Sequence, residues 1–322
     1  MPKGDQVKNG KAFEYSLAYQ YYIYLQHENI NVEMVDNSAL KVARGFYNSF
    51  PDNKKEEFDT ASKQTIEIMQ KIEPGLRAQT KHSDKLFISL QNDSKGATGD
   101  VRDVVFRRIK PAWEIGFSAK NNNDAVKHSR LSHVLDFGNE WVGCPCSQTY
   151  WDEIKPVFNY LLKRKSEGHT FKSLGDDKIR YVYIPLLKAF RKELIRINNN
   201  NVGVPAKLIK YLIGNYSFYK VIKDDSHNLV IVKAFNTDNK LNKTVNGVKT
   251  KYTTPKINLP NRIVEFDFMA GRESTTLDLI LDGGWEVSFR IHSADSKIVP
   301  SLKFDIQLLG NPPILFTQNI FR

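Results

Sequence analysis

The chain has few residues that form covalent cross-links and no long apolar run that could cross a membrane. Its 322 residues include two cysteines, Cys144 and Cys146. The single residue between them is a poor spacing for a disulfide and is not the gap of a zinc knuckle. No stretch approaches the roughly 18 apolar residues that a membrane span needs, and the first ten residues lack the apolar part of a signal peptide. We therefore expect reduced thiols, no membrane segment and a cytoplasmic location.

Acidic residues are outnumbered by basic ones. Lys and Arg total 47 and Asp and Glu total 36, which gives a formal net charge of +11. A surplus of this size favours a polyanionic partner, either nucleic acid or an anionic membrane surface. Hydrophobic residues make up 41 % of the chain, which is enough for the substantial core of one large or two ordinary domains.

Periodicity predicts a helical start, a small mixed core and a β-rich end. Expected helices cover 11–27, 36–48, 54–72, a segment starting near 124, 149–165, 183–198 and 204–214. Expected strands cover 101–107, 113–120, 216–222, 229–235, 263–268, 276–281, 285–291 and 302–309. The polar segment 236–258 is expected to be a loop. We predict two regions, residues 1–215 with the helices and the mixed core, and residues 216–322 as the β-rich region.

The strand expected at 113–120 has an unusual polar face. Successive side chains of a strand point to opposite faces, so the apolar residues of this segment share one face. The other face holds a carboxylate, a glycine, a hydroxyl and an ammonium: Glu114, Gly116, Ser118 and Lys120. The small glycine would let a bulky ligand approach the strand. This set is more varied than an ordinary solvated face.

The preceding strand brings further carboxylates, Asp100 at its entry and Asp103 within it. In an antiparallel hairpin, Asp103 would lie opposite Phe117 or Ser118, and the sequence alone does not fix which. Directly opposed residues share a face, so only the register opposite Ser118 places Asp103 on the face of Lys120. An aspartate, a serine and a lysine on neighbouring strands are also compatible with a solvated sheet edge.

Phosphodiester hydrolysis is the chemistry that fits this set of residues. Carboxylates bind Mg²⁺, and a nearby lysine stabilises the charge of the transition state. One carboxylate is a poor magnesium site, and Glu14, Asp100 and Glu114 are candidates for the second. Glu14 falls within the apolar arc of helix 11–27, where a charge is costly unless it is compensated. Glu114 is on the same strand face as Lys120 but about 20 Å from it along an extended strand.

These segments resemble the nuclease core called PD-(D/E)XK. The resemblance runs through Gly99-Asp100-Val101-Arg102-Asp103-Val104-Val105, then Glu114 to Asn122, then Lys127 to Ser132. The entry segment Asn9 to Tyr15 is similar to the first helix of several restriction endonucleases. The C-terminal run Gly284 to His292, followed by Pro300 to Asp305, resembles the HaeIII-like family of type II restriction endonucleases.

This resemblance implies an α/β fold, a mixed sheet flanked by helices with a β-rich C-terminal region. It also implies Mg²⁺-dependent cleavage of double-stranded DNA, at the palindrome GGCC for HaeIII-like enzymes. By motif position, Asp103 is the metal-binding aspartate and Lys120 the catalytic lysine. Ser118 stands where the motif has an acidic residue, so the missing carboxylate must come from elsewhere, with Glu14 and Glu114 as candidates.

Basic residues near the core and in the β-rich end are candidates for contact with DNA. Guanine O6 and N7 are commonly read by Arg or Lys, and phosphates attract any cation. The candidates are Lys127, His128, Arg130, Arg290, His292, Lys297 and Lys303. The first three are expected on the helix near residue 124, and ordinary solvated faces are the alternative for all of them. A palindromic target favours a two-fold dimer, although monomers acting in turn can also cut short sites.

Two other functions remain open at this point. A DNA-binding protein without catalysis would explain Ser118 as the mark of a degenerate site. A repair or recombination nuclease that reads DNA structure would use the same core but leave no fixed sequence at the cut ends. The sequence favours the site-specific endonuclease.

Overall fold

The computed structural model describes residues 3–78, 84–92, 99–122, 124, 126–127, 129–293 and 296–321. The chain forms two compact units, each built from separate stretches of sequence. Unit 1 contains residues 1–124, 214–257 and 314–322, and unit 2 contains residues 125–213 and 258–313. These units do not follow the predicted division at residue 215, because the β-rich segment 216–322 contributes strands to both.

Unit 1 is a mixed seven-stranded sheet flanked by helices, with strand order β1-β2-β3-β4-β6-β7-β12. Its helices are α1 (Lys3–His27), α2 (Ser38–Asn48), α3 (Asp52–Ile72) and the short 3-10 helix η1 (Pro74–Leu76). Its strands are β1 (Val32–Met34), β2 (Leu86–Leu90), β3 (Val104–Arg108), β4 (Trp113–Asn121), β6 (Phe218–Asp224), β7 (Leu229–Phe235) and β12 (Thr317–Phe321). This architecture confirms the expected fold class.

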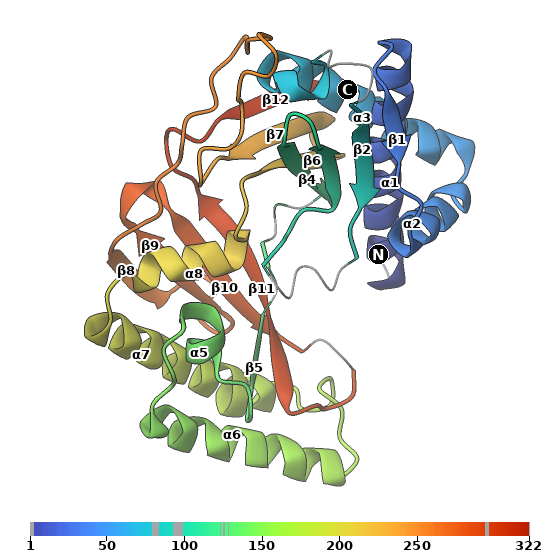
Figure 1. Ribbon diagram of the computed structural model, residues 1–322. Coiled ribbons are helices and arrows are strands. Elements are labelled where there is room, and N and C mark those ends of the chain that lie inside the picture. Colours follow the sequence, from blue (N-terminus) through green and yellow to red (C-terminus); the bar gives the residue numbers. More distant parts are fainter. Residues whose placement is uncertain are drawn as a thin grey trace. The chain divides into compact units, whose positions relative to one another are not determined.

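Helix α1 packs its apolar arc against one face of this sheet. Tyr21 contacts the rings of Phe106 on β3 and Phe117 on β4, with ring centroids 5.0 and 5.5 Å apart. In Figure 1 the blue helices α1 and α2 lie together at the β1–β2 side of unit 1. Because Phe117 and its strand neighbours of the same parity fill this core, the alternating residues of β4 point to the opposite face.

Unit 2 is a five-stranded antiparallel sheet covered by helices, with strand order β5-β11-β10-β9-β8. Its helices are α5 (Phe137–Val142), α6 (Gln148–Ser166), the π-helix η2 (Ile179–Tyr183), α7 (Ile184–Asn200) and α8 (Val204–Ile213). Its strands are β5 (Arg130–Ser132), β8 (Ile263–Phe268), β9 (Thr276–Leu281), β10 (Glu286–His292) and β11 (Ser301–Gly310), and η3 (Asp282–Gly284) links β9 to β10.

The core of unit 2 is aromatic and lies on one face of this sheet. The ring of Phe190 on α7 lies 5.4 Å from that of Phe289 on β10 and 5.1 Å from that of Phe304 on β11. Trp141 of α5 packs on Phe190 as well, at 5.5 Å. Since these strand residues point to the helices, the residues between them, including Arg290, form the polar face of the sheet.

The prediction of a helix starting near residue 124 is wrong. The described residues from 124 to 129 are not helical, and Arg130 begins strand β5. The backbone N–H of Val126 donates to the Ile306 carbonyl, that of Lys127 to the Leu212 carbonyl, and the Ser129 carbonyl accepts from Phe304. Bonds to neighbouring elements therefore replace the helical pattern, because tertiary pairing outweighs weak local preference.

The two thiols are free, as expected. In the part of the chain that the structure describes, no helix is long and apolar enough to cross a membrane.

Candidate active site

The hairpin of β3 and β4 brings Asp103 and Lys120 together. The register pairs Val104 with Phe117, and one step further along the hairpin it places Asp103 opposite Ser118. This is the one of the two predicted registers in which the aspartate shares a face with Lys120. The Lys120 Nζ donates to the Asp103 Oδ2 at 3.2 Å. The spatial condition for a catalytic pair is therefore met.

The Asp103 carboxylate is oriented by strand β4. The backbone N–H of Ala119 donates to Oδ2 at 2.8 Å, and the Ser118 hydroxyl lies 3.3 Å from the same oxygen. These donors and Lys120 converge on one oxygen of the carboxylate. Ser118, which replaces an acidic residue of the motif, thus acts as a neighbour of Asp103 that can hold its orientation.

The carboxyl of Glu14 in α1 interacts electrostatically with this pair. Its side chain is almost fully buried, with 6 % of the residue exposed, and Lys11 donates to its Oε2 at 3.0 Å. Burial and, after it, the negative charge of Asp103 raise the pKa of Glu14 to about 8, although the charges of Lys11 and Lys120 act to lower it. Glu14, Asp103 and Lys120 therefore lie within one another's electrostatic field.

Asp100 and Glu114 are held by a different residue, Arg102. The guanidinium binds Asp100 through two nitrogens, at 2.7 and 2.8 Å, and binds Glu114 through a third at 2.7 Å. Burial acts to raise the pKa of Asp100, but hydrogen bonds from Arg102 and Gln91 outweigh it and lower that pKa. Arg102 binds both carboxylates and so links the segment before β3 to β4, a role that its position in the sequence did not indicate.

Gly116 makes room for this arginine. A Cβ at position 116 would lie 2.3 Å from the Arg102 Cδ, so the guanidinium stem passes directly over the glycine. On its other side Arg102 stacks on Tyr216, with its Cζ 4.4 Å from the ring centroid. A bulky ligand was expected to approach at Gly116, but in the structure the Arg102 side chain occupies this space.

A metal ion at this site would draw on few protein ligands. Among the residues that the structure describes, no three His, Cys, Asp or Glu side chains are grouped as a metal site. Asp103 and Glu14 remain as a pair of oxygen donors. Magnesium is commonly held by one or two carboxylates, several waters and substrate phosphates, so this pair fits it.

Three of the predicted DNA contacts form one row on the polar face of the unit 2 sheet. Arg130 of β5 is paired with Lys303 of β11, and Lys303 is paired with His292 of β10. Directly paired residues share a face, so the three basic side chains lie side by side. Burial lowers the pKa of His292, and so do the charges of Arg290 and Lys303, which favours a neutral imidazole at pH 7.

The remaining candidates differ from one another in their surroundings. Arg290 lies on the same face and binds the Asp305 carboxylate at 2.7 Å, with about half of its side chain (53 %) exposed. The Lys127 ammonium lies over the Tyr211 ring, 3.9 Å from the centroid, and burial lowers its pKa. Lys297 lies outside the named strands, in an isolated bridge with Thr170. His128 falls outside the described residues.

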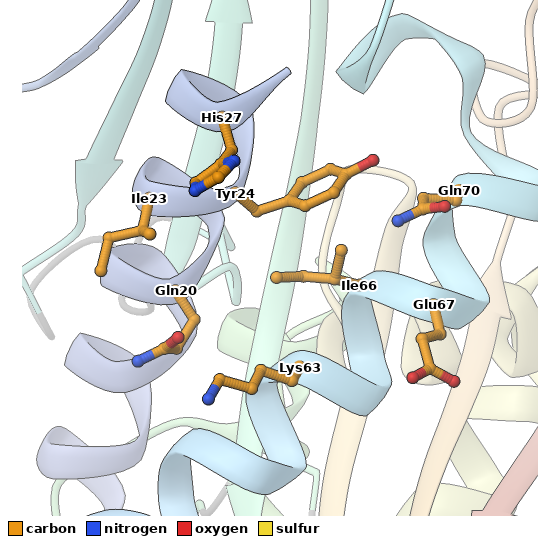
Figure 2. Close-up of a pocket in the computed structure, with 8 residues that line it drawn as sticks. All are labelled: Gln20, Ile23, Tyr24, His27, Lys63, Ile66, Glu67 and Gln70. Atoms are coloured by element: carbon orange, nitrogen blue, oxygen red, sulfur yellow. The ribbon is translucent and has the colours of Figure 1, made fainter.

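A pocket of about 280 Å³ lies elsewhere in unit 1, between α1 and α3 (Figure 2). Four residues from each helix line it: Gln20, Ile23, Tyr24, His27, Lys63, Ile66, Glu67 and Gln70. None of the predicted site residues is among them. The catalytic candidates are therefore assigned from the hairpin and α1, not from this pocket.

Comparison with known proteins identifies the family of the chain. The family model described as HaeIII restriction endonuclease matches residues 10–312. The chain is 38 % identical over 306 residues to the type II restriction enzyme HaeIII of Haemophilus aegyptius, covering 94 % of each protein. The chain belongs to the HaeIII restriction endonuclease family. No solved structure matched the chain.

Membership of this family confirms the resemblance found in the sequence. The protein is a type II site-specific deoxyribonuclease, which acts on double-stranded DNA, and enzymes of this class use a divalent metal cofactor. The match to the HaeIII family model covers residues of both units. Both the hairpin and the β-rich end are therefore part of the sequence that the family shares.

Proposed function

We propose that this endonuclease cleaves double-stranded DNA at GGCC, with Asp103, Glu14 and Lys120 as its central catalytic residues and Mg²⁺ as its cofactor. The observation that carries the proposal is the 3.2 Å contact between Asp103 and Lys120 beside the buried Glu14. The identity of 38 % to HaeIII over 94 % of both chains supports the target sequence.

Asp103 and Glu14 would hold the divalent cation. Burial and then the charge of Asp103 raise the pKa of Glu14 to about 8, so its ionised form is costly here and a cation would stabilise it. When bound, the ion would make a water molecule more acidic and neutralise charge on the phosphate. Asp100 and Glu114 are less suited to this role, because Arg102 already binds both carboxylates.

The protein's own groups would act around the phosphate. Once the Asp103 carboxylate binds a cation, the Lys120 ammonium is available to stabilise the negative charge of the transition state. Ser118 and the Ala119 N–H keep Asp103 in place through the bonds described above. Glu114 contributes through Arg102, by tying β4 to the segment that carries Asp100 and Asp103.

Unit 2 would recognise the DNA through the polar face of its sheet. Arg130, Lys303 and His292 form a row of donors. Beside them, the Arg290–Asp305 pair offers donors for guanine O6 and N7 and an acceptor for cytosine N4. Lys127 and His128 precede this row in the chain, and we assign them to phosphate contact.

A palindromic target favours two copies related by a two-fold axis, so we include a homodimer in the proposal. Because restriction enzymes act on DNA that enters the cell, we also place the protein in the cytoplasm.

Digestion of a sequenced plasmid tests the proposal directly. With Mg²⁺, the wild type should give discrete fragments whose ends map to GGCC. Asp103→Asn and Lys120→Ala should bind a GGCC duplex but leave it uncut. Random ends would reject the proposed target, and a Lys120→Ala variant that retains full activity would reject the proposed site.

A further inference from the structure

A buried lysine lies directly beside the proposed catalytic hairpin. Lys220 of β6 is paired in register with Ser118 of β4, and with Lys233 of β7 on its other side. Because paired residues share a face, Asp103, which precedes β3, forms one row with Ser118 of β4, Lys220 of β6 and Lys233 of β7. Lys220 is 3 % exposed, so it is almost fully buried.

Asp124 is the partner of both lysines. The Lys220 Nζ forms an ion pair with one oxygen of the Asp124 carboxylate and also donates to the Asp124 backbone carbonyl at 2.9 Å. The Lys233 Nζ donates to the other carboxylate oxygen. An ammonium buried without a partner is costly, and removing one member of a buried pair leaves the other uncompensated. Two cations therefore fix the position of one aspartate.

The position of Asp124 in the chain gives this cluster a consequence for catalysis. Asp124 lies four residues after Lys120, at the end of the segment that leaves β4. Asn122 within that segment is also held, since its N–H donates to the Lys223 carbonyl at 2.7 Å and its amide donates to Asp225. The chain on the C-terminal side of Lys120 is thus anchored at two points.

Electrostatics links the cluster to the hairpin as well. Burial, helped by the charges of Lys120 and Lys233, lowers the pKa of Lys220 to about 8, although the charge of Asp124 opposes that change. Lys120 and Lys220 therefore influence each other across the sheet.

We infer that Lys220 is a positioning residue for DNA cleavage. Together with Lys233 it anchors Asp124, and this anchor fixes the end of β4 so that Lys120 stays beside Asp103. The inference rests on the proposed catalytic role of Asp103 and Lys120. An ordinary buried ion pair, which stabilises the fold without affecting the reaction, is the alternative that the experiment must separate.

The test compares Lys220→Met, Asp124→Asn and the double variant. Methionine fills the space of the lysine stem without its charge, and asparagine keeps the shape of the aspartate. We expect each single variant to lower the single-turnover cleavage rate by about tenfold or more, with Kd for a GGCC duplex changed by less than about twofold. If both act through one anchor, the double variant should be no slower than the slower single variant.

A matched control addresses the loss of stability. Val221 is the next residue of β6, points to the opposite face and is fully buried. Val221→Ala should lower the melting temperature yet leave the cleavage rate unchanged well below that temperature. The inference is overturned if folded Lys220→Met cleaves at the wild-type rate, if the two single effects multiply, or if Val221→Ala slows cleavage equally.

Two further results keep the test decisive. If Lys220→Met does not fold, the cleavage rate of Asp124→Asn alone tests the inference. Wild-type activity in that variant would show that cleavage does not need the anchor. Failure of the proposed site is recognised separately, since Asp103→Asn or Lys120→Ala would then cleave normally. In that case the positioning role of Lys220 is rejected together with the proposed site. If the Asp103 and Lys120 variants are inactive but Lys220→Met is active, only the positioning role is rejected.

Discussion

The Asp103 carboxylate lies close enough to Glu14 that its charge adds to the effect of burial in raising the pKa of Glu14. Glu14 comes from the first helix and Asp103 from the residue just before β3, so the fold brings together two acids that are far apart in sequence. Like charges held together in a buried place form a site that a cation stabilises. Glu14 is therefore the best candidate for the acid that Ser118 replaces in the motif.

Replacement of Glu14 by glutamine should abolish most cleavage while leaving DNA binding intact. A metal ion contributes several kcal/mol to the transition state, and each ~1.4 kcal/mol is a factor of ten in rate, so we expect a loss of about 10² or more. The cleavage rate at several Mg²⁺ concentrations measures this, and excess metal should restore part of it.

Glu114→Gln is the matched control for that experiment. Glu114 is also a carboxylate of the hairpin region, but its partner is Arg102 at 2.7 Å. We expect an unchanged requirement for Mg²⁺ and at most a modest loss of rate. If Glu114→Gln were inactive and Glu14→Gln active, the second metal ligand would have to be reassigned.

Metal binding should release a proton and strengthen as the pH rises. The pKa of Glu14 is about 8 in the metal-free protein, so its carboxyl is mostly protonated at pH 7 and must ionise to bind a cation. Affinity should therefore increase with pH up to about 8 and then level off. Calorimetric titration with Mn²⁺, which takes the same oxygen ligands, in buffers of different ionisation enthalpy should show close to one proton released at pH 7. Glu14→Gln should lose that release, and an unchanged value would contradict the assignment.

Alanine at position 116 should destabilise unit 1 and slow cleavage. Its Cβ would overlap the Arg102 stem at 2.3 Å and push the guanidinium away from Asp100 and Glu114. Overpacking of this kind costs ~1–3 kcal/mol. Gly45→Ala is the control, because nothing lies within 4 Å of a Cβ there and alanine favours the interior of helix α2 by ~0.5–1 kcal/mol. Urea denaturation of both variants gives the comparison, and a Gly116→Ala protein as stable as Gly45→Ala would exclude the clash.

The local sequence pattern predicted the hairpin of β3 and β4 because its signals lie within about twenty residues. The alternation of 113–120 fixed which side chains share a face, and only the register remained open. The structure resolved it in favour of Ser118 opposite Asp103. The helix predicted at 54–72 agrees with α3 (Asp52–Ile72), whereas the helix predicted at 11–27 has the end of α1 but not its start, which lies at Lys3.

Features that depend on distant partners were not predictable in this way. Arg102 reads as one more surface cation, and its burial follows from Gly116, Glu114 and Tyr216, which become neighbours only after folding. Strand β2 was missed because its five residues carry little periodicity of their own, and pairing with β1 and β3 defines it. The anchor at Asp124 likewise depends on the order of the strands in the sheet. That order cannot be predicted from a local sequence pattern.

The polar face of the unit 2 sheet should separate two kinds of DNA contact. Lys303→Ala, in the row with Arg130 and His292, should weaken binding to all sequences and reduce the salt slope by about one. Arg290→Ala should cost about 1–3 kcal/mol at the cognate site and relax the preference for one G·C pair. Arg164→Ala serves as the control, because Arg164 lies on α6 and is paired with Glu167. It should change neither the salt slope nor the sequence preference. Binding isotherms for GGCC and single-substitution duplexes at several salt concentrations measure both effects. Equal effects of all three changes would reject this face as the DNA contact.

The buried Glu73 should make the stability of the protein depend on pH. This carboxyl lies at the end of α3, where it accepts hydrogen bonds from the Tyr219 hydroxyl at 2.8 Å and the Asn242 N–H at 2.9 Å. Burial raises its pKa from 4.5 to about 7, which these bonds only partly oppose. The folded state therefore binds a proton more tightly than the unfolded state. Its contribution is fully present below pH 4.5 and is lost as the pH rises through about 7.

The size of this effect is measurable with one variant. A change of pKa from 4.5 to about 7 corresponds to on the order of 3 kcal/mol between the two ends of that pH range. Glu73→Gln cannot ionise, so the difference in unfolding free energy between wild type and variant should shift in favour of the variant as the pH rises from 4.5 to 8. Urea denaturation at half-unit pH steps, with metal absent, isolates this slope from the contribution of Glu14, which both proteins share. A constant difference across the range would mean that Glu73 ionises in the folded protein as readily as in the unfolded chain.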